Sequence, residues 1–205
     1  MSENVGIPTL YRHTQFRSRL EARWAAFFDL VDWDWEYEPL DLPGWIPDFI
    51  IFCPGDYWTY EECPHKLPKK NIFVEVKPID DFDDFEDRQK VFNALKQSKY
   101  SGTEVLVLGY RIIEYGPCVS KIGWLMDFML PSEEARYDYG FDGAHIALYN
   151  NGSWGLEAEC GSFTNRITGR RDCDKPGRRW ESQYDLDTLW AKAGNEVQYK
   201  RNRVA

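Results

Sequence analysis

The sequence predicts an α/β protein, with a mixed central sheet flanked by helices and a C-terminal β-hairpin and helix. In the first half of the chain, the hydrophobic pattern indicates a helix, three strands, a second helix and a fourth strand, in that order. Hairpin-like links join the first three strands, whereas a helical crossover to the fourth is typical of a parallel pair. Asn151-Gly152, between two apolar runs, is a strong hairpin signal.

The first predicted helix covers residues 14–31, with Thr14 as its N-cap. Its apolar side chains recur at helical spacing and form one stripe. Arg17 falls inside this stripe, and Glu21, one turn later, lies at its edge. An arginine in a core-facing stripe needs a partner, which Glu21 can provide four residues away. The stripe consists of Phe16, Leu20, Trp24, Phe27, Phe28 and Val31.

The other elements follow from strand alternation, turn residues and helical spacing. The pattern at 122–130 is ambiguous between strand and helix. The expected elements are strands at 33–38, 46–52, 72–77 and 104–110, a helix at 86–100, hairpin strands at 144–150 and 154–160, and a helix at 185–199. Together they indicate an N-terminal arm (1–13), a core (14–110, with an inserted loop at 53–71) and a C-terminal extension (111–205) of unassigned function, packed on the core.

Composition limits the classes of function. A chain of 205 residues with 43% apolar residues predicts one globular domain rather than a disordered protein. Its net charge of −9 argues against a non-specific nucleic-acid coat protein. It does not argue against a nucleic-acid enzyme, because a metal site itself concentrates carboxylates. No apolar run is long enough to span a membrane, and residues 1–4 lack the features of a signal peptide. These two observations, together with an odd number of cysteines (five), favour a reduced, cytoplasmic compartment.

One strand carries an unusual pair of charges. Within residues 72–77, side-chain alternation puts Glu75 and Lys77 on the same face of an otherwise apolar strand. A second carboxylate, Asp48, lies in another apolar run. Charged groups are rarely buried unless they are paired or bind a metal. Two strand carboxylates and a lysine are enough to hold a divalent cation and orient a water molecule.

These residues resemble a known signature. Pro47-Asp48, followed by Glu75-Val76-Lys77, is similar to the PD-(D/E)XK signature of the restriction-endonuclease-like nuclease superfamily. The helix at 14–31 also resembles the first helix of the phage Holliday-junction resolvase and transposon-end nuclease branches, in which a helix glutamate joins the site. The resemblance covers residues 14–110 and implies a restriction-endonuclease-like core.

The resemblance also implies a site for Mg²⁺ or Mn²⁺ and a role for each group. Asp48 and Glu75 would provide carboxylate ligands and the carbonyl of Val76 another, and Glu21 would help to hold a second ion or a bridging water. Lys77 would orient the attacking water and offset negative charge in the transition state. The alternative is that Glu75 and Lys77 form a solvated ion pair, which contributes little to stability.

Basic residues are candidates for contacts to DNA phosphates. Arg17 could either pair with Glu21 or reach the scissile phosphate. The basic side of the second helix, which borders the cleft in related folds, and a basic cluster within 161–180 could contact phosphates without reading the sequence. For the cluster, a solvated loop that offsets nearby acidic residues is an equal alternative. The candidates are Lys90, Lys96 and Lys99 on the helix, and Arg166, Arg170, Arg171, Lys175, Arg178 and Arg179 in the cluster.

Two other groups of residues are expected to be structural. The acidic run at 80–87 lacks the glycine and terminal glutamate of a calcium loop, and is predicted to be a solvated lead-in to the second helix. The cysteines include no C-x-x-C pair, although Cys53, Cys63 and His65 share the inserted loop. Separate thiols are therefore expected rather than a zinc site.

The leading hypothesis is a Mg²⁺-dependent DNA endonuclease that prefers branched or otherwise structured DNA, because no base-reading module is visible. The resemblance is to small phage-encoded proteins, which implies a bacterial host cytoplasm. One alternative is a non-catalytic protein of the same fold that binds a host defence or replication protein through its acidic surface. Another is a nuclease acting on RNA or on a small nucleotide. Resolvase-like relatives are often homodimers, but this sequence shows no interface signature.

Overall fold

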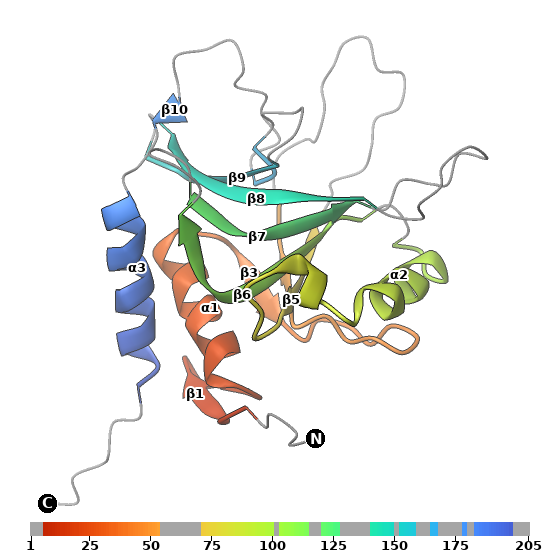
Figure 1. Cartoon of the computed structure of the whole chain (residues 1–205). Coiled ribbons are helices and arrows are strands. Elements are labelled where there is room, and N and C mark those ends of the chain that lie inside the picture. Colours follow the sequence, from red (N-terminus) through yellow and green to blue (C-terminus); the bar gives the residue numbers. More distant parts are fainter. Residues whose placement is uncertain are drawn as a thin grey trace, which may run out of the picture.

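The structure is a computed structural model, and it describes residues 6–53, 71–100, 103–114, 120–127, 140–149, 152–158, 165–167, 178–179 and 183–198. Its centre is a mixed sheet of eight strands. Helices α1 (Arg19–Leu30) and α3 (Gln183–Glu196) lie side by side on one face of the sheet. Helix α2 (Arg88–Lys96) packs on the opposite face (Figure 1). The mixed α/β class is therefore confirmed.

The strand order agrees with the predicted connectivity of the first half of the chain. The strands pair in the order β10-β8-β7-β6-β5-β4-β3, and β9 pairs with β8. Strands β3, β4 and β5 are antiparallel neighbours, whereas β5 and β6 are parallel and are connected through α2. The strands are β3 (Trp35–Tyr37), β4 (Phe49–Ile51), β5 (Ile72–Val76), β6 (Val105–Glu114), β7 (Ser120–Asp127), β8 (Gly140–Tyr149), β9 (Trp154–Ala158) and β10 (Arg178–Arg179).

Two hydrophobic cores lie on the two faces of the sheet. Because alternate side chains of a strand point to opposite faces, Ile72 and Val74 pack in the core that contains α1 and α3. Phe73 packs in the other core, together with α2. Glu75 and Lys77 share the face of Phe73 by the same alternation. The charged end of β5 therefore points to the side of the sheet on which α2 begins.

The predicted start of the first helix was wrong. Thr14–Phe16 forms strand β2, which pairs with β1 (Thr9–Tyr11) in a separate antiparallel hairpin. Helix α1 begins after Ser18, whose hydroxyl accepts a hydrogen bond of 3.1 Å from the backbone N–H of Glu21 and so caps the helix. Arg17 therefore lies before the helix and not within its apolar stripe.

The acidic run at 80–87 is not simply a solvated lead-in. Phe82–Asp84 forms a short 3-10 helix, η1, and both Phe82 and Phe85 are buried against α2 and the sheet. Helix α2 is consequently shorter than the predicted helix at 86–100. The aromatic residues within the run anchor it to the core, which leaves its carboxylates at the surface or at the site described below.

The second half of the chain extends the same sheet. The ambiguous segment at 122–130 contributes to strand β7, and β6 continues to Glu114, past the core boundary placed after residue 110. The predicted β8–β9 hairpin is confirmed, and Gly152 in its turn has a φ of +81°, which glycine adopts without strain. The basic segment within 161–180 contains β10, which pairs with β8. No helix in the described ranges is both long and apolar enough to cross a membrane.

Candidate functional site

Asp48 and Glu75 meet at one end of two neighbouring strands. In the antiparallel pair of β4 and β5, Phe49 faces Val74, so the preceding Asp48 and the following Glu75 also face each other. Both residues are buried, with 3% and 4% of their surface exposed, respectively. The strand register therefore brings together two carboxylates that are far apart in the sequence.

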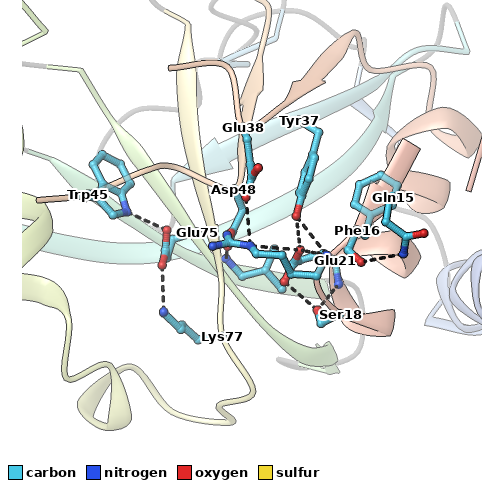
Figure 2. Close-up of polar contacts among 12 residues, drawn as sticks. Gln15, Phe16, Ser18, Glu21, Tyr37, Glu38, Trp45, Asp48, Glu75 and Lys77 are labelled. Atoms are coloured by element: carbon cyan, nitrogen blue, oxygen red, sulfur yellow. Dashed lines mark hydrogen bonds and ion pairs between the residues drawn. The ribbon is translucent and has the colours of Figure 1, made fainter. Parts of the chain in front are cut away.

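Each of these carboxylates accepts a hydrogen bond from a fixed donor. The backbone N–H of Val76 donates to Oδ2 of Asp48 at 2.7 Å, and the indole N–H of Trp45 donates to Oε2 of Glu75 at 2.8 Å. Figure 2 shows Glu75 between Trp45 and Lys77. The remaining oxygens, Oδ1 of Asp48 and Oε1 of Glu75, contact cationic side chains.

Lys77 lies between two carboxylates. Its ammonium nitrogen is 3.0 Å from Oε1 of Glu75 and 2.8 Å from Oδ2 of Asp87, the residue that precedes α2. Burial alone would lower the pKa of Lys77, but Glu75 and Asp87 raise this pKa above its ordinary value. The hydrogen bond from Lys77 in turn lowers the pKa of Asp87. Lys77 is therefore protonated at neutral pH, where it can offset negative charge but cannot act as a base.

Arg17 brings a second cation to the site. Its guanidinium pairs with Oδ1 of Asp48, and its Nε lies 3.0 Å from Oε1 of Glu38 and 4.0 Å from Oε2 of Glu21. Burial alone would lower the pKa of Arg17, but the Asp48 carboxylate raises it above its ordinary value. The main partner of Arg17 is therefore Asp48, and the predicted partner Glu21 is more distant.

Glu21 lies close to the site but is engaged in capping α1. Its Oε1 accepts a hydrogen bond of 2.8 Å from the Ser18 hydroxyl. Its Oε2 accepts one of 2.7 Å from the Tyr37 hydroxyl and one of 3.2 Å from the backbone N–H of Arg17 (Figure 2). Ser18 and Glu21 have the spacing of a capping box, a sequence signal that predicts this role.

Burial disfavours the ionisation of both strand carboxylates. Burial, and then the nearby charge of Glu75, raise the pKa of Asp48 well above its ordinary value, although Val76 and Arg17 act in the opposite direction. Burial also raises the pKa of Glu75, and Lys77 and Trp45 offset this only in part. Additional positive charge at this position would therefore be favourable.

A pocket of about 950 Å³ opens onto these groups. Asp48, Glu75 and Lys77 line it together with Val76 and Glu21, so the structure brings the predicted catalytic and metal-binding residues to one cavity. Other parts of the pocket wall are cationic or apolar. The cationic lining residues include Arg17, Arg19 and Lys90, and the less polar ones include Ile46 and Tyr110.

The donor set has the chemistry that Mg²⁺ or Mn²⁺ requires. Asp48 and Glu75 supply the carboxylate oxygens that hard divalent cations prefer, and burial raises the pKa of both groups. Within the described ranges, however, no three His, Cys, Asp or Glu side chains cluster closely enough to hold a metal ion. Glu21 is occupied by its cap, whereas Arg17 and Lys77 pair with Asp48 and Glu75, respectively. Cationic side chains thus balance the two strand carboxylates in this structure.

The predicted phosphate-binding residues are divided among several places. Lys90 lines the pocket, whereas Lys96 and Lys99 lie over the rings of Phe92 and Tyr100, at 5.5 and 5.2 Å from the ring centroids. These two lysines do not belong to the pocket wall.

Of the predicted basic cluster, the structure describes the side chain of Arg166 alone. Arg166 is buried, with its guanidinium 3.2 Å from Oε1 of Glu104, so this residue does not present its charge on the surface. Arg178 and Arg179 form β10, and their side chains lie outside the described residues, as do Arg170, Arg171 and Lys175 entirely.

Sequence reasoning missed four side chains that complete the site. Asp87 was assigned to the solvated acidic run, but it holds Lys77. Glu38 and Tyr37, at the end of β3, contact Arg17 and Glu21. Trp45, in the segment between β3 and β4, holds Glu75. Only the alternation of Tyr37 and Glu38 along a strand was visible in the sequence, and it does not reveal which groups they contact.

Cys53, one of the residues considered for zinc, is a buried free thiol. Burial, followed by the nearby charge of Glu104, raises its pKa to about 12. Cys63, His65, Cys160 and Cys173 lie outside the described residues. The expectation that the cysteines do not bind zinc stays a prediction.

Comparison with known proteins returns no match to a protein-family model, a curated protein or a solved structure.

Proposed function

We propose that this protein is a divalent-metal-dependent DNA endonuclease with a restriction-endonuclease-like core. The observation that carries the proposal is the pair of buried carboxylates, Asp48 and Glu75, facing each other across β4 and β5 at the wall of a pocket, with Lys77 beside them. Burying two acids next to each other costs stability, which is typical of functional sites. The order of helix, three antiparallel strands, helix and parallel strand supports the same family.

Asp48 and Glu75 would hold Mg²⁺ or Mn²⁺, with the Val76 carbonyl as a further oxygen ligand and Glu21 at the edge of the site. The bound ion would supply Lewis-acid stabilisation of the scissile phosphate and would lower the pKa of water, so that a nucleophilic hydroxide forms near neutral pH by loss of a proton to solvent. Lys77 contributes a fixed positive charge beside the reacting phosphate, because its pKa is raised and it is held by both Glu75 and Asp87. Arg19 and Lys90, on the pocket wall, would contact flanking phosphates.

The preference for branched or structured DNA is supported by the apolar part of the pocket wall. Ile46 and Tyr110 line the pocket and are 41% and 45% exposed. The exposed ring of Tyr110, on the same pocket wall as cationic groups, suits an unpaired base, because bases stack on aromatic side chains with little regard to sequence. Unpaired bases occur at flaps and branch points but not within intact duplex DNA.

The test is cleavage of a panel containing duplex, nicked, flap and four-way DNA, together with single-stranded RNA, in the presence of Mg²⁺ or Mn²⁺. Wild-type protein is expected to cleave a branched DNA only with metal, and Asp48→Asn and Lys77→Met are each expected to abolish cleavage. Glu36→Gln is the matched control, because Glu36 is an exposed carboxylate on β3 outside the pocket wall. Absence of metal-dependent cleavage on every substrate would refute the nuclease proposal, and preferential RNA cleavage would favour an RNA nuclease.

A second candidate function is supported by the balanced charges of the site. Arg17 and Lys77 already pair with Asp48 and Glu75, which is the arrangement expected of a nuclease fold that binds another protein instead of cleaving DNA. The net charge of −9 fits a partner with a basic surface, such as a host defence or replication protein. This candidate predicts no cleavage by wild-type protein and a stoichiometric host complex that Asp48→Asn retains.

A further inference from the structure

We propose that Arg17 is a built-in counter-ion that keeps the divalent ion out of the site until a nucleic-acid phosphate takes over its guanidinium. Metal and nucleic acid would then bind cooperatively, each increasing the affinity for the other. This inference rests on the proposed function, since it concerns the same carboxylates. It is carried by the contacts of Arg17, which pairs with the candidate metal ligand Asp48.

The backbone of Arg17 is fixed while its side chain is accessible. The backbone N–H lies 3.2 Å from Oε2 of Glu21 and 3.2 Å from the hydroxyl of Tyr37, at the junction of β2 and α1. The side chain is 56% exposed, in contrast to 5% for the side chain of Asp48. The guanidinium can therefore leave Asp48 by side-chain rotation into the pocket that it lines, without any change in the fold.

The Asp48 carboxylate needs a cation whenever it is ionised. It is buried next to Glu75, and the backbone N–H of Val76 is its only other described donor. Removing Arg17 from Asp48 would leave a buried charge uncompensated, which is unfavourable. Departure of Arg17 and arrival of a divalent ion are therefore two parts of one exchange of cations.

Arg17 in turn needs an anion after it leaves Asp48. Its remaining neighbour at close distance is Glu38, whose side chain is 36% exposed and so holds it weakly. A phosphate of the bound nucleic acid is a further acceptor, because guanidinium groups bind phosphate oxygens, as they bind carboxylates, with two parallel hydrogen bonds. Nucleic acid therefore promotes metal binding, and the reciprocal effect has the same magnitude because the two equilibria are linked.

Lys77 does not take part in this exchange. It contacts Glu75 and Asp87 together, so it keeps a carboxylate partner when Glu75 binds another cation. Arg19 provides a matched control for Arg17. It is also a pocket-lining arginine and is exposed, but it makes no ion pair with any residue in the described ranges.

The experiment measures Mn²⁺ binding directly, by electron paramagnetic resonance of free Mn²⁺ and by calorimetry. Without nucleic acid, Arg17→Gln is expected to bind Mn²⁺ about tenfold more tightly than wild type, a size typical of coupled sites, and Arg19→Gln to match wild type. Arg17→Met, which also removes the guanidinium and leaves Asp48 and Glu38 intact, should shift the Mn²⁺ affinity in the same direction by a similar factor. It provides the test if Arg17→Gln fails to fold.

A second arm repeats the measurement with a flap DNA oligonucleotide, in a Lys77→Met background that prevents cleavage. DNA is expected to tighten Mn²⁺ binding by about tenfold when Arg17 is present and to have little effect in the Arg17→Gln protein. Equal Mn²⁺ affinities for wild type, Arg17→Gln and Arg17→Met would overturn the inference and leave the nuclease proposal standing. Tighter Mn²⁺ binding by Arg17→Gln in a protein that cleaves no substrate would leave the counter-ion role of Arg17 standing and refute the nuclease proposal.

Discussion

The carboxylate of Asp48 accepts a 2.7 Å hydrogen bond from the backbone N–H of Val76, which ties the residue before β4 to the last residue of β5. The contact places Asp48 beside Glu75 and fixes its carboxylate where these two strands end. One residue thus has two roles: it joins two strands, and it provides the oxygen atoms of the proposed metal site. The two roles can be separated by substitution.

Asp48→Ala and Asp48→Asn are expected to differ in stability but not in activity. Alanine leaves the Val76 N–H buried without an acceptor, which costs about 1–3 kcal/mol, whereas asparagine retains an acceptor oxygen. Both substitutions remove the carboxylate charge and should abolish cleavage. Urea unfolding measures the stability, and equal midpoints for the two variants would show that the Val76 bond does not contribute.

Lys77 is expected to act by its charge and not as a base. Lys77→Met should reduce cleavage by about 10³-fold or more, to below detection, as for other groups that stabilise developing charge, and Lys77→Arg should retain part of the activity. Asp87→Asn should lower the pKa of Lys77, because it removes a carboxylate that raises this pKa. NMR titration of the lysine side chains measures the pKa, with Lys99→Met as a surface control. A Lys77 pKa that is unchanged in Asp87→Asn would contradict the proposed contact.

Glu21 is expected to matter more for the stability of α1 than for chemistry. Ser18→Ala and Glu21→Ala each remove one half of the capping interaction and should each destabilise the protein by about 1 kcal/mol. Their effects should not add, because both substitutions disrupt the same pair of contacts. Thermal or urea unfolding of the two single variants and the double variant tests this. Additive losses would indicate that Glu21 acts independently of the cap.

The affinity for a divalent metal ion is expected to rise with pH. This rise should occur at higher pH than at a site formed by ordinary carboxylates. A protonated carboxyl does not bind a divalent ion, and the pKa values of Asp48 and Glu75 are raised, chiefly by burial. Mn²⁺ binding should therefore continue to tighten above about pH 4.5, where ordinary Asp and Glu are already ionised, and level off only above the raised pKa values. Calorimetry across this range should also detect proton release on binding. An affinity that is constant from about pH 5 upward would show that both acids are already ionised.

The pair of Arg166 and Glu104 is expected to be structural. Both side chains are only 9% exposed, and removal of one partner leaves a buried charge. Arg166→Ala should therefore destabilise the protein by about 3–5 kcal/mol. Replacement of both residues by apolar side chains of similar volume, Arg166→Met with Glu104→Leu, should recover most of the loss. Urea unfolding measures both effects. A stable Arg166→Ala protein with weakened DNA binding would instead support the phosphate contact predicted from the sequence.

The parts of the fold that follow from local patterns were predictable. Strands β4 and β5 are short apolar runs with prolines on both sides in the sequence, and the β8–β9 hairpin is marked by Gly152. The start of α1 was misplaced because Phe16, which precedes Ser18, fits a helical stripe as well as a strand. Pairing with β1, a contact between separate segments, decides in favour of the strand.

The candidate site was also predictable only in part. The alternation within β5 was enough to predict that Glu75 and Lys77 share a face. It could not show that Trp45 and Asp87 hold them, because these contacts join segments whose separation in space depends on the packing of α2 and on strand register. For the same reason Arg166, which looks like a surface residue in a basic segment, is buried against Glu104.

The sequence by itself determined the α/β class, the residues that carry the candidate chemistry and the face of β5 from which they project, because these depend on local periodicity and residue type. Only the tertiary structure decided the charge balance of the site. In the structure, Arg17 pairs with Asp48, Glu21 takes part in the cap of α1, and Lys77 lies between two carboxylates. Ion pairing depends on distances between segments and on burial, neither of which a linear pattern of residues contains.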